Sequence, residues 1–420
     1  MKLLVVGSGG REHAVIRKLK ENKEIEKIYC APGNGGISAD AECVDIKATD
    51  KENMVKFAKE NAIDFCVVTP DDPLALGMVD VMEEAGIPCF GPKANAAIIE
   101  ASKAFSKDLM KKYGIPTADY ETFDNEKDAL HYIEEKNTFP IVIKADGLAL
   151  GKGVLICETL DDAKTALREM MVEHVFGLSG NKVVVEEFMT GKEVSVLAFT
   201  DGNVVKPMIS SMDHKRAYDN DEGLNTGGMG TIAPSPYYTK EIAATCMETI
   251  FLPTVKAMNA EGRTFKGCLY FGLMLTPKGP RVVEYNCRFG DPETQVVLPL
   301  LNSDLLTIMK ACHDGTLKDV DVVWSEEACA CVVEASGGYP VKYEKGFEIH
   351  GLDENGQHDG VIVYHAGTKK ENGKFYTNGG RVLGITAKGA TLQDALDKAY
   401  EAVKEIGFDK MHYRTDIGKK

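Results

Sequence analysis

Residues 282–295 read VVEYNCRFGDPETQ and join an apolar strand to a dense run of polar and charged side chains. In an extended strand, Glu284 and Asn286 point to the same face. Both offer oxygen ligands of the kind that Mg²⁺ accepts beside phosphates and water. Arg288, two positions further on, is predicted to share that face and to meet a transferring phosphoryl group. The stretch therefore predicts phosphoryl transfer at the end of a buried strand.

A second stretch, residues 141–154, reads IVIKADGLALGKGV. It predicts a hairpin over phosphate groups, because glycines allow close approach and lysines supply compact positive charge. An ordinary hairpin with surface lysines is the alternative. Lys144 argues against that alternative, since it closes an apolar strand where an unpaired charge is costly.

A third stretch, residues 183–189, reads VVVEEFM and is followed by Glu193. Such a strand can present backbone groups to the edge of an adenine, and Glu193 can accept hydrogen bonds from ribose hydroxyls. Taken alone, the pattern favours an amphipathic strand with solvated acids.

The first hundred residues alternate strand-like and helix-like segments, which predicts a parallel sheet covered by helices, as in a Rossmann-like unit. The expected strands are Leu3–Val6, Lys27–Cys30, Glu42–Asp45 and Phe65–Thr69, and the expected helices are Glu12–Lys23, Asn53–Asn61 and Pro73–Ala85.

Two glycine-rich loops follow the first two expected strands, at residues 7–13 (GSGGREH) and 31–36 (APGNGG). Backbone N–H groups at such a turn can cradle a phosphate. The first loop is not a dinucleotide fingerprint, because Glu12 stands where the third glycine belongs. A close-packed turn is the plainer interpretation of either loop, but two loops on adjacent strands indicate a sugar-phosphate site.

The rest of the chain predicts a small α+β unit at residues 121–194, a long polar loop at Asp213–Gly230, and a further α+β unit at the C-terminus. The other expected elements are strands at residues 265–276, 280–286, 328–334, 360–367 and 381–387, and helices at residues 103–113, 304–314 and 392–403. We expect three units, at residues 1–101, 102–325 and 326–420, with residues 121–194 forming a lid. The last unit shows no chemistry of its own and is expected to complete the cleft.

Composition narrows the classes of partner. The net charge of −15 disfavours nucleic acid and anionic membranes. The apolar runs are too short to span a bilayer, and no secretory pattern is visible at the N-terminus, so we expect a cytoplasmic protein. Eleven cysteines without a CxxC pair argue against a zinc ribbon.

Together these motifs resemble those of ATP-grasp enzymes and, more narrowly, of the phosphoribosylamine–glycine ligase family. The resemblance spans nearly the whole chain, and RFGDPETQ is that family's own signature. The other matching segments are GSGGREHA (7–14), SKAFSK (102–107), IPTA (115–118), residues 141–154, DHKR (213–216) and NTGGMG (225–230).

The resemblance implies a role for each motif. Arg288, Lys144 and Asp291 would be catalytic, and Glu284 with Asn286 would hold Mg²⁺ or Mn²⁺. The residues expected to bind ATP are Lys103, Lys144, Gly151, Lys152, Gly153, Glu186, Glu187, Phe188, Met189 and Glu193. Those expected to bind the other substrates are Gly9, Gly10, Arg11, Glu12, Asn34, Gly35, Asp71, Asp213, Lys215, Arg216, Arg288, Gly290 and Asp291.

The implied reaction joins glycine to 5-phospho-D-ribosylamine with ATP, through a glycyl phosphate, in a monomer or weak homo-oligomer. Two alternatives stay open: an ATP-grasp carboxylase that uses bicarbonate, and a nicotinamide-dependent dehydrogenase. Two departures from the usual patterns also bear on the site. Asp71 stands where the family usually has glutamate, and residues 271–275 carry no acid for a second metal.

Overall fold

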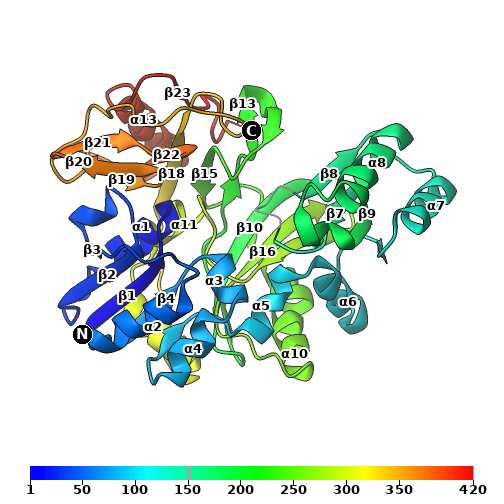
Figure 1. Cartoon of the computed structure of the whole chain (residues 1–420), viewed down its shortest axis with the longest axis horizontal. Coiled ribbons are helices and arrows are strands. Elements are labelled where there is room, and N and C mark those ends of the chain that lie inside the picture. Colours follow the sequence, from blue (N-terminus) through cyan, green and yellow to red (C-terminus); the bar gives the residue numbers. More distant parts are fainter. Residues whose placement is uncertain (149–152, 420) are drawn as a thin grey trace.

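The computed structural model describes residues 1–148 and 153–419, and four main sheets organise it (Figure 1). We call them the N-terminal, lid, central and C-terminal sheets. The N-terminal and C-terminal sheets lie on one side of the molecule and the lid sheet projects from the other, with the central sheet between them (Figure 1). None of the helices in the described ranges is long and apolar enough to cross a membrane.

The N-terminal sheet is fully parallel, with the order β3-β2-β1-β4-β5. Alternate residues of β1 enter two different apolar cores, which is why its sequence is continuously apolar. The strands are β1 (Lys2–Gly7), β2 (Lys27–Pro32), β3 (Glu42–Cys43), β4 (Phe65–Val68) and β5 (Cys89–Phe90), and the main helices are α1 (Gly10–Leu19), α2 (Lys51–Glu60) and α5 (Ala94–Ala101).

The prediction of one continuous helix at residues 73–85 is wrong. Residues 73–85 form two helices, α3 (Asp71–Ala75) and α4 (Met78–Glu84), instead of one. Gly77 separates them with a φ of +87°, a left-handed conformation that ends the first helix.

The lid sheet is antiparallel, with the order β6-β9-β7-β8. Helices α7 (Glu126–Lys136) and α8 (Leu160–Leu167) bury Ile133 and Leu167 against it. The strands are β6 (Tyr120–Phe123), β7 (Ile141–Ala145), β8 (Val154–Cys157) and β9 (Val183–Glu187). The lid sheet thus carries both β7, which contains Lys144, and β9, the strand expected to face adenine.

The central sheet has the order β11-β10-β16-β17 and supplies the strand that ends at Asn286. Its strands are β10 (Lys192–Thr200), β11 (Val205–Pro207), β16 (Gly267–Thr276) and β17 (Gly279–Asn286). The neighbouring helices are α6 (Lys103–Tyr113), α9 (Lys240–Cys246), α10 (Leu252–Ala260) and α12 (Leu305–Asp314), whereas α11 (Thr294–Val297) packs against α1 and the C-terminal sheet.

The C-terminal sheet has the order β12-β15-β18-β22-β19, with β23 also paired to β18. Its strands are β12 (Met212–Asp213), β15 (Gly230–Ala233), β18 (Ala328–Ser336), β19 (Ile362–His365), β22 (Arg381–Gly389) and β23 (Met411–His412), and α13 (Leu392–Val403) packs on one face. Because β12 and β15 precede residue 326, the sheet extends across the expected boundary between the last two units.

The predicted polar loop at Asp213–Gly230 is also wrong in part. It contains a hairpin of β13 (Arg216–Tyr218) and β14 (Glu222–Asn225), and its two ends pair into the C-terminal sheet as β12 and β15. Short strands rich in charge and glycine carry no clear alternation, so the local pattern did not reveal them. A second unpredicted hairpin joins β20 (Thr368–Glu371) to β21 (Lys374–Thr377).

Candidate active site

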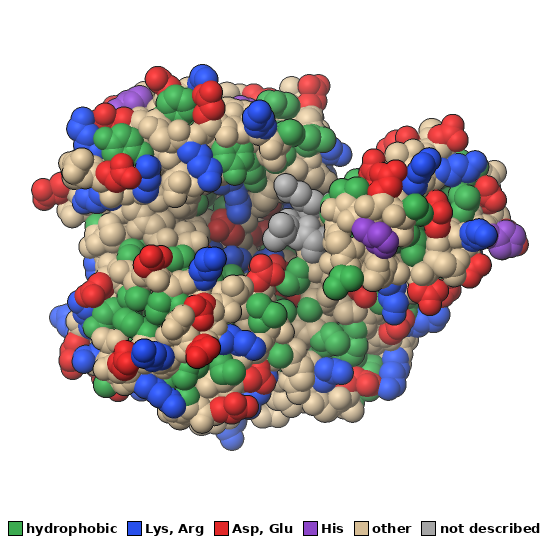
Figure 2. Space-filling view, in the orientation of Figure 1, with side chains coloured by type: hydrophobic (Ala, Val, Ile, Leu, Met, Phe, Trp, Pro, Cys, Tyr) green, Lys and Arg blue, Asp and Glu red, His purple; other side chains and the backbone are tan. Residues whose placement is uncertain are grey.

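A hollow lies between the lid and the units that carry the N-terminal and C-terminal sheets, and acidic and basic side chains gather at its floor (Figure 2). A pocket is bounded by strands β10, β12 and β16 and by the end of β17. Its polar lining residues are Glu193, Ser195, Asp213, Lys215, Tyr270 and Glu284. Side chains far apart in the sequence therefore meet at the strand that begins the VVEYNCRFGDPETQ motif.

Glu284 lines this pocket and is close to several cationic side chains. Its carboxylate is 3.7 Å from the Lys215 ammonium. Burial disfavours ionisation of Glu284, but Lys215, Lys144, Lys103 and Arg288 together lower its pKa. Glu284 is therefore kept as a carboxylate.

Asn286, two residues further along β17, is buried, and its amide nitrogen donates to the Tyr285 carbonyl. Glu284 and Asn286 form a small set of oxygen donors beside a cationic site. No cluster of three or more His, Cys, Asp or Glu suited to a metal occurs among the described residues. Two protein oxygens fit a divalent ion such as Mg²⁺, which keeps its other positions for phosphate and water.

Two buried lysines share one carboxylate between the lid sheet and α6. Lys107 and Lys144 each place their ammonium 3.1 Å from Oε2 of Glu186. The other oxygen of Glu186, Oε1, is buried and has no hydrogen-bond partner among the described residues. Burial, opposed by Glu186, lowers the pKa of Lys107 to about 8. Glu186 is therefore held as an acceptor with one oxygen free.

Lys103 begins α6 and reaches the lid, where its ammonium donates to the Gly147 carbonyl at 2.5 Å. Burial lowers the pKa of this lysine. Ser102 caps the same helix and also donates to Asp146. The start of α6 is thus tied to the segment that follows the lysine strand.

Arg288 lies just beyond the end of β17, not on the strand as its spacing predicted, because the strand ends at Asn286. Its guanidinium is 3.1 Å from Oε1 of Glu100, at the end of α5. The other oxygen of Glu100 accepts from the Cys287 backbone at 2.8 Å. Burial alone would lower the pKa of Arg288, but Glu100 and Asp71 raise it. This arginine is a fixed cation.

Asp291 is contacted from three parts of the chain. Its Oδ2 accepts from the Arg11 backbone N–H at 3.3 Å, and its Oδ1 accepts from Gln295 at 2.9 Å. Arg381, on β22, places Nη2 3.4 Å from Oδ1. Burial would raise the pKa of Asp291, but Arg381 and Arg11 lower it.

Two buried hydroxyl groups of the pocket lining are hydrogen-bonded to each other. The hydroxyls of Ser195 and Tyr270 are 2.8 Å apart, and Tyr270 donates to Glu293 at 3.0 Å. Burial and the charge of Glu293 raise the pKa of Asp213 well above its ordinary value. Glu284 also raises the pKa of Lys215, which favours the charged ammonium, whereas the raised pKa of Asp213 favours its neutral acid. The pocket therefore has an acidic end and a cationic end.

The first glycine-rich loop is built around Glu12. Its carboxylate accepts from the Gly9 N–H at 2.6 Å and pairs with Arg11 at 2.7 Å, so it caps α1 from within. Gly10 packs closely enough that a Cβ there would lie 2.5 Å from Gln295.

The second loop makes contacts toward the C-terminal sheet. The Asn34 amide donates to the carbonyls of Ser8 and His365, and the Gly35 N–H donates to Thr368. Asn34 and Gly35 therefore join the N-terminal unit to the C-terminal part of the chain.

The remaining expected residues lie at several places. Glu187, the last residue of β9, is exposed and pairs with Arg281 at 2.6 Å. Phe188, beyond the strand, is also exposed, and Met189 is half-buried. Arg216 donates to the Gly223 carbonyl within its own hairpin. A Cβ at Gly290 would lie 2.4 Å from Glu293. Gly153 follows the gap in the described ranges, and Gly151 and Lys152 lie outside the described residues.

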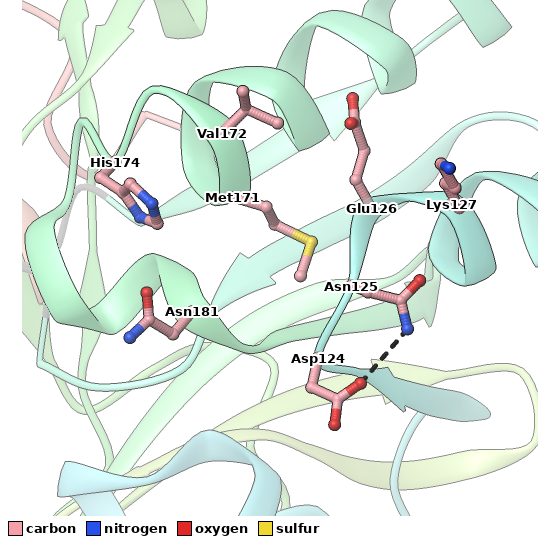
Figure 3. Close-up of a pocket in the computed structure, with 8 residues that line it drawn as sticks. All are labelled: Asp124, Asn125, Glu126, Lys127, Met171, Val172, His174 and Asn181. Carbon is pink, nitrogen blue, oxygen red and sulfur yellow. Dashed lines mark hydrogen bonds between the residues drawn. The ribbon is translucent and has the colours of Figure 1, made fainter.

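A second hollow, on the lid, is separate from these groups (Figure 3). It lies between the start of α7 and the segment around Met171 and His174. Asp124 and Asn125 are joined there by a hydrogen bond of 3.3 Å (Figure 3). It holds none of the expected site residues.

The residues at the site that were not predicted from the sequence include Glu100, Lys107, Tyr270 and Arg381. Lys107 offered a weak signal, because it lies one helical turn after Lys103 on the predicted helix. The other three lie on ordinary helix or strand segments, and only the packing of the units brings them to the site.

Comparison with known families supplies the decisive observation. Three models of phosphoribosylglycinamide synthetase match consecutive parts of the chain: the N domain matches residues 1–100, the ATP-grasp (A) domain residues 101–294, and the C domain residues 329–420. The chain belongs to the phosphoribosylglycinamide synthetase family.

Relatives agree over the full length. Phosphoribosylamine–glycine ligase of Caldanaerobacter subterraneus is 49% identical over 99% of each chain, and that of Clostridium acetobutylicum is 48% identical over 100% of each. The solved phosphoribosylamine–glycine ligase of Thermotoga maritima shares 33% identity over 100% of both chains, with a TM-score of 0.88. The ATP-grasp fold and the predicted family are therefore confirmed.

Biotin carboxylases also resemble the chain in three dimensions. The biotin carboxylase domain of the Hydrogenobacter thermophilus 2-oxoglutarate carboxylase gives a TM-score of 0.74, but its identity is 18%. That likeness shows the shared fold alone, and the family match does not support the bicarbonate alternative. Membership of an ATP-grasp family carries with it the use of ATP and a divalent metal.

Proposed function

We propose that this chain catalyses the ATP-dependent ligation of glycine to 5-phospho-D-ribosylamine, forming glycinamide ribonucleotide, ADP and phosphate in purine biosynthesis. The observation that carries the proposal is the relationship to phosphoribosylamine–glycine ligases over the whole chain at nearly half identity. The pocket supports it, because lysines, an arginine and a small oxygen-ligand set meet beside an acidic end.

ATP is proposed to lie between the lid sheet and the central sheet. Lys103 and Lys144 would contact its phosphates, and Gly151, Lys152 and Gly153 stay among the residues proposed to bind ATP. The free Oε1 of Glu186 suits the exocyclic amine of adenine, since a buried acceptor gains from a donor. Glu187, Phe188 and Met189 would line the base, and Glu193 would receive the ribose hydroxyls.

Glu284 and Asn286 are proposed to hold Mg²⁺ or Mn²⁺. The ion would supply neutralisation of phosphate charge during transfer. Glu284→Gln is expected to reduce turnover at least tenfold, because the negative charge of the metal ligand is lost. The thermal midpoint is expected to stay unchanged, because glutamine keeps the size of the side chain. Steady-state rates at several Mg²⁺ and Mn²⁺ concentrations would check this, and full turnover at saturating metal would contradict the assignment.

The chemistry has two steps. A glycine carboxylate oxygen attacks the γ-phosphorus, the bond to the β–γ bridging oxygen breaks, and ADP leaves. The phosphoribosylamine nitrogen then attacks the glycyl carbonyl, loses a proton as the C–N bond forms, and releases phosphate. Arg288 with Lys144 would stabilise the charge that moves between these oxygens, since phosphoryl transfer depends on positioning and charge neutralisation.

The other two substrates are proposed to enter from opposite sides of Arg288. Asp213, Lys215 and Arg216 would serve the glycine side with Gly290. The N-terminal loops would serve the phosphoribosylamine side; their residues are Gly9, Gly10, Arg11, Glu12, Asn34, Gly35 and Asp71. Asp291 lies where the two sides meet.

The proposal includes a division into residues 1–101, 102–325 and 326–420, with residues 121–194 as the lid. It also includes a cytoplasmic location, a monomer or weak homo-oligomer, and small molecules as the only partners.

The decisive experiment measures ADP release from ATP and Mg²⁺ while glycine or phosphoribosylamine is omitted in turn. Full turnover is expected only with both, together with glycinamide ribonucleotide as product. ADP release that ignores glycine would overturn the proposed reaction. Bicarbonate added in place of glycine provides the control for the carboxylase alternative.

A further inference from the structure

Arg381 brings the C-terminal sheet into the active site. It is the first residue of β22, yet its guanidinium reaches the segment after β17. Nη1 donates to the Asp291 carbonyl at 2.9 Å and to the Gly227 carbonyl at 2.8 Å. Nη2 lies 3.4 Å from the Asp291 carboxylate. One side chain therefore holds two segments that are far apart in the sequence.

Both segments held by Arg381 border the proposed substrate site. Asp291 also accepts from the backbone of Arg11, on the phosphoribosylamine side. Gly227 precedes Gly228, where a Cβ would lie 2.7 Å from the Asp213 carboxylate. A displaced guanidinium would release the Asp291 carboxylate and the Gly227 peptide together.

The C-terminal part of the chain holds Gly227 from a second direction. The Gly227 N–H donates to the Tyr339 hydroxyl at 2.9 Å. A Cβ on Gly227 would lie 2.9 Å from Cζ of Arg381, so the peptide packs directly on the guanidinium. Glycine is needed here because the arginine occupies the space of a side chain.

We propose that Arg381 is a positioning residue through which the C-terminal sheet sets the Asp291 carboxylate against the N-terminal loop that receives phosphoribosylamine. It acts through Asp291 and the Gly227 peptide. Arginine is required because its planar fork bonds a carboxylate and two carbonyls at fixed angles, which a point charge on a lysine does not reproduce. The proposal rests on the proposed function.

The test compares Arg381→Ala and Arg381→Lys with a control on the same strand, Lys388→Ala. Lys388 lies near the other end of β22, where its half-exposed side chain pairs with Glu327. The Michaelis constants for phosphoribosylamine, glycine and ATP are measured separately, with the thermal midpoint of each protein. The alanine variant is also assayed with added guanidinium ion.

We expect Arg381→Ala to raise the KM for phosphoribosylamine by about 10- to 100-fold, the loss typical of a charge-assisted hydrogen bond. The KM for ATP should change by less than about twofold, because no contact joins Arg381 to the lysines of the lid among the described residues. Arg381→Lys should have a KM for phosphoribosylamine between those of the wild type and the alanine variant. Added guanidinium should restore part of the loss in the alanine variant, since the native side chain is partly exposed. Lys388→Ala should match the wild type.

Equal rises in all three Michaelis constants with a lowered thermal midpoint would overturn the proposal, since they would mean a merely structural role. Constants like those of Lys388→Ala would also overturn it. A wild-type enzyme without glycine-dependent turnover would instead reject the proposed function. If the alanine variant does not fold, the lysine variant decides the question. An unchanged KM for phosphoribosylamine in Arg381→Lys would show that the planar guanidinium is not required, and would overturn the proposal.

Discussion

At the scale of single residues, the charges of the site depend on partners outside the motifs that carry them. Arg288 belongs to the RFGDPETQ motif, but its guanidinium is held by Glu100 at the end of α5. Burial raises the pKa of Glu100 and the adjacent Arg288 opposes that rise. Both side chains are largely shielded from solvent, with 18% of Arg288 and 8% of Glu100 exposed, so removing one charge leaves the other poorly compensated.

Glu100→Gln is therefore expected to lower kcat by about 10- to 100-fold, the range given by losing a hydrogen bond to a charged group. The glutamine keeps the size of the side chain and can still accept from the Cys287 N–H. Steady-state kinetics on the variant check this, with Glu84→Gln on the exposed side of α4 as the control. An unchanged kcat would mean that Arg288 is positioned without Glu100.

At the scale of elements, β18 shows how a strand covered on both faces constrains its polar residues. All nine of its residues are buried. Glu334 is among them, and neither of its carboxylate oxygens has a hydrogen-bond partner among the described residues. Burial raises the pKa of Glu334 well above its ordinary value of 4.5, so the folded protein favours the protonated acid.

The sign of the resulting pH dependence follows from proton linkage. The folded state binds a proton at Glu334 that the unfolded chain releases above about pH 4.5, so this residue lowers the unfolding free energy as pH rises toward the folded-state pKa. Glu334→Gln is expected to be more stable than the wild type, by a margin that grows as the pH rises above the ordinary glutamate pKa of 4.5 toward the folded-state pKa. Urea unfolding at several pH values measures this, with exposed Glu354→Gln as the control. A margin that does not change with pH would contradict it.

At the scale of the whole molecule, the N-terminal and C-terminal sheets are joined by buried histidines. His13 donates from Nε2 to Asp40 at 2.9 Å, and its Nδ1 accepts from the His365 backbone at 2.9 Å. The His365 ring bonds Thr368 and the Gly356 carbonyl. A Cβ on Gly36 would overlap this ring, so the glycine-rich loop and the C-terminal sheet fit closely.

This contact should weaken in acid. Burial and the neighbouring His13 lower the pKa of His365 from 6.5 to about 3. Because the unfolded chain takes up the proton first, stability is lost as pH falls below about 6.5, by about 2 kcal/mol between pH 7 and pH 5. His365→Gln should flatten the pH dependence of the unfolding free energy by that amount. Parallel curves for the variant and the wild type would show that His365 does not titrate in this way.

The sequence by itself determined what depends on residues close together in the chain. The pairing of Glu284 with Asn286 follows from the two-residue period of a strand, and the continuously apolar β1 and β4 follow from a parallel sheet covered on both faces. The family and its reaction class were readable because RFGDPETQ and the lysine hairpin are contiguous motifs.

Only the tertiary structure decided which distant residues complete that site. Glu100 meets Arg288, Lys107 meets Glu186, and Arg381 meets Asp291. Each partner lies in a helix or strand whose local sequence fits many surroundings, so its place depends on how whole sheets pack. Short-range backbone geometry fixes neighbours a few residues apart, whereas contacts between units are set by the packing of buried surfaces, which no local pattern records.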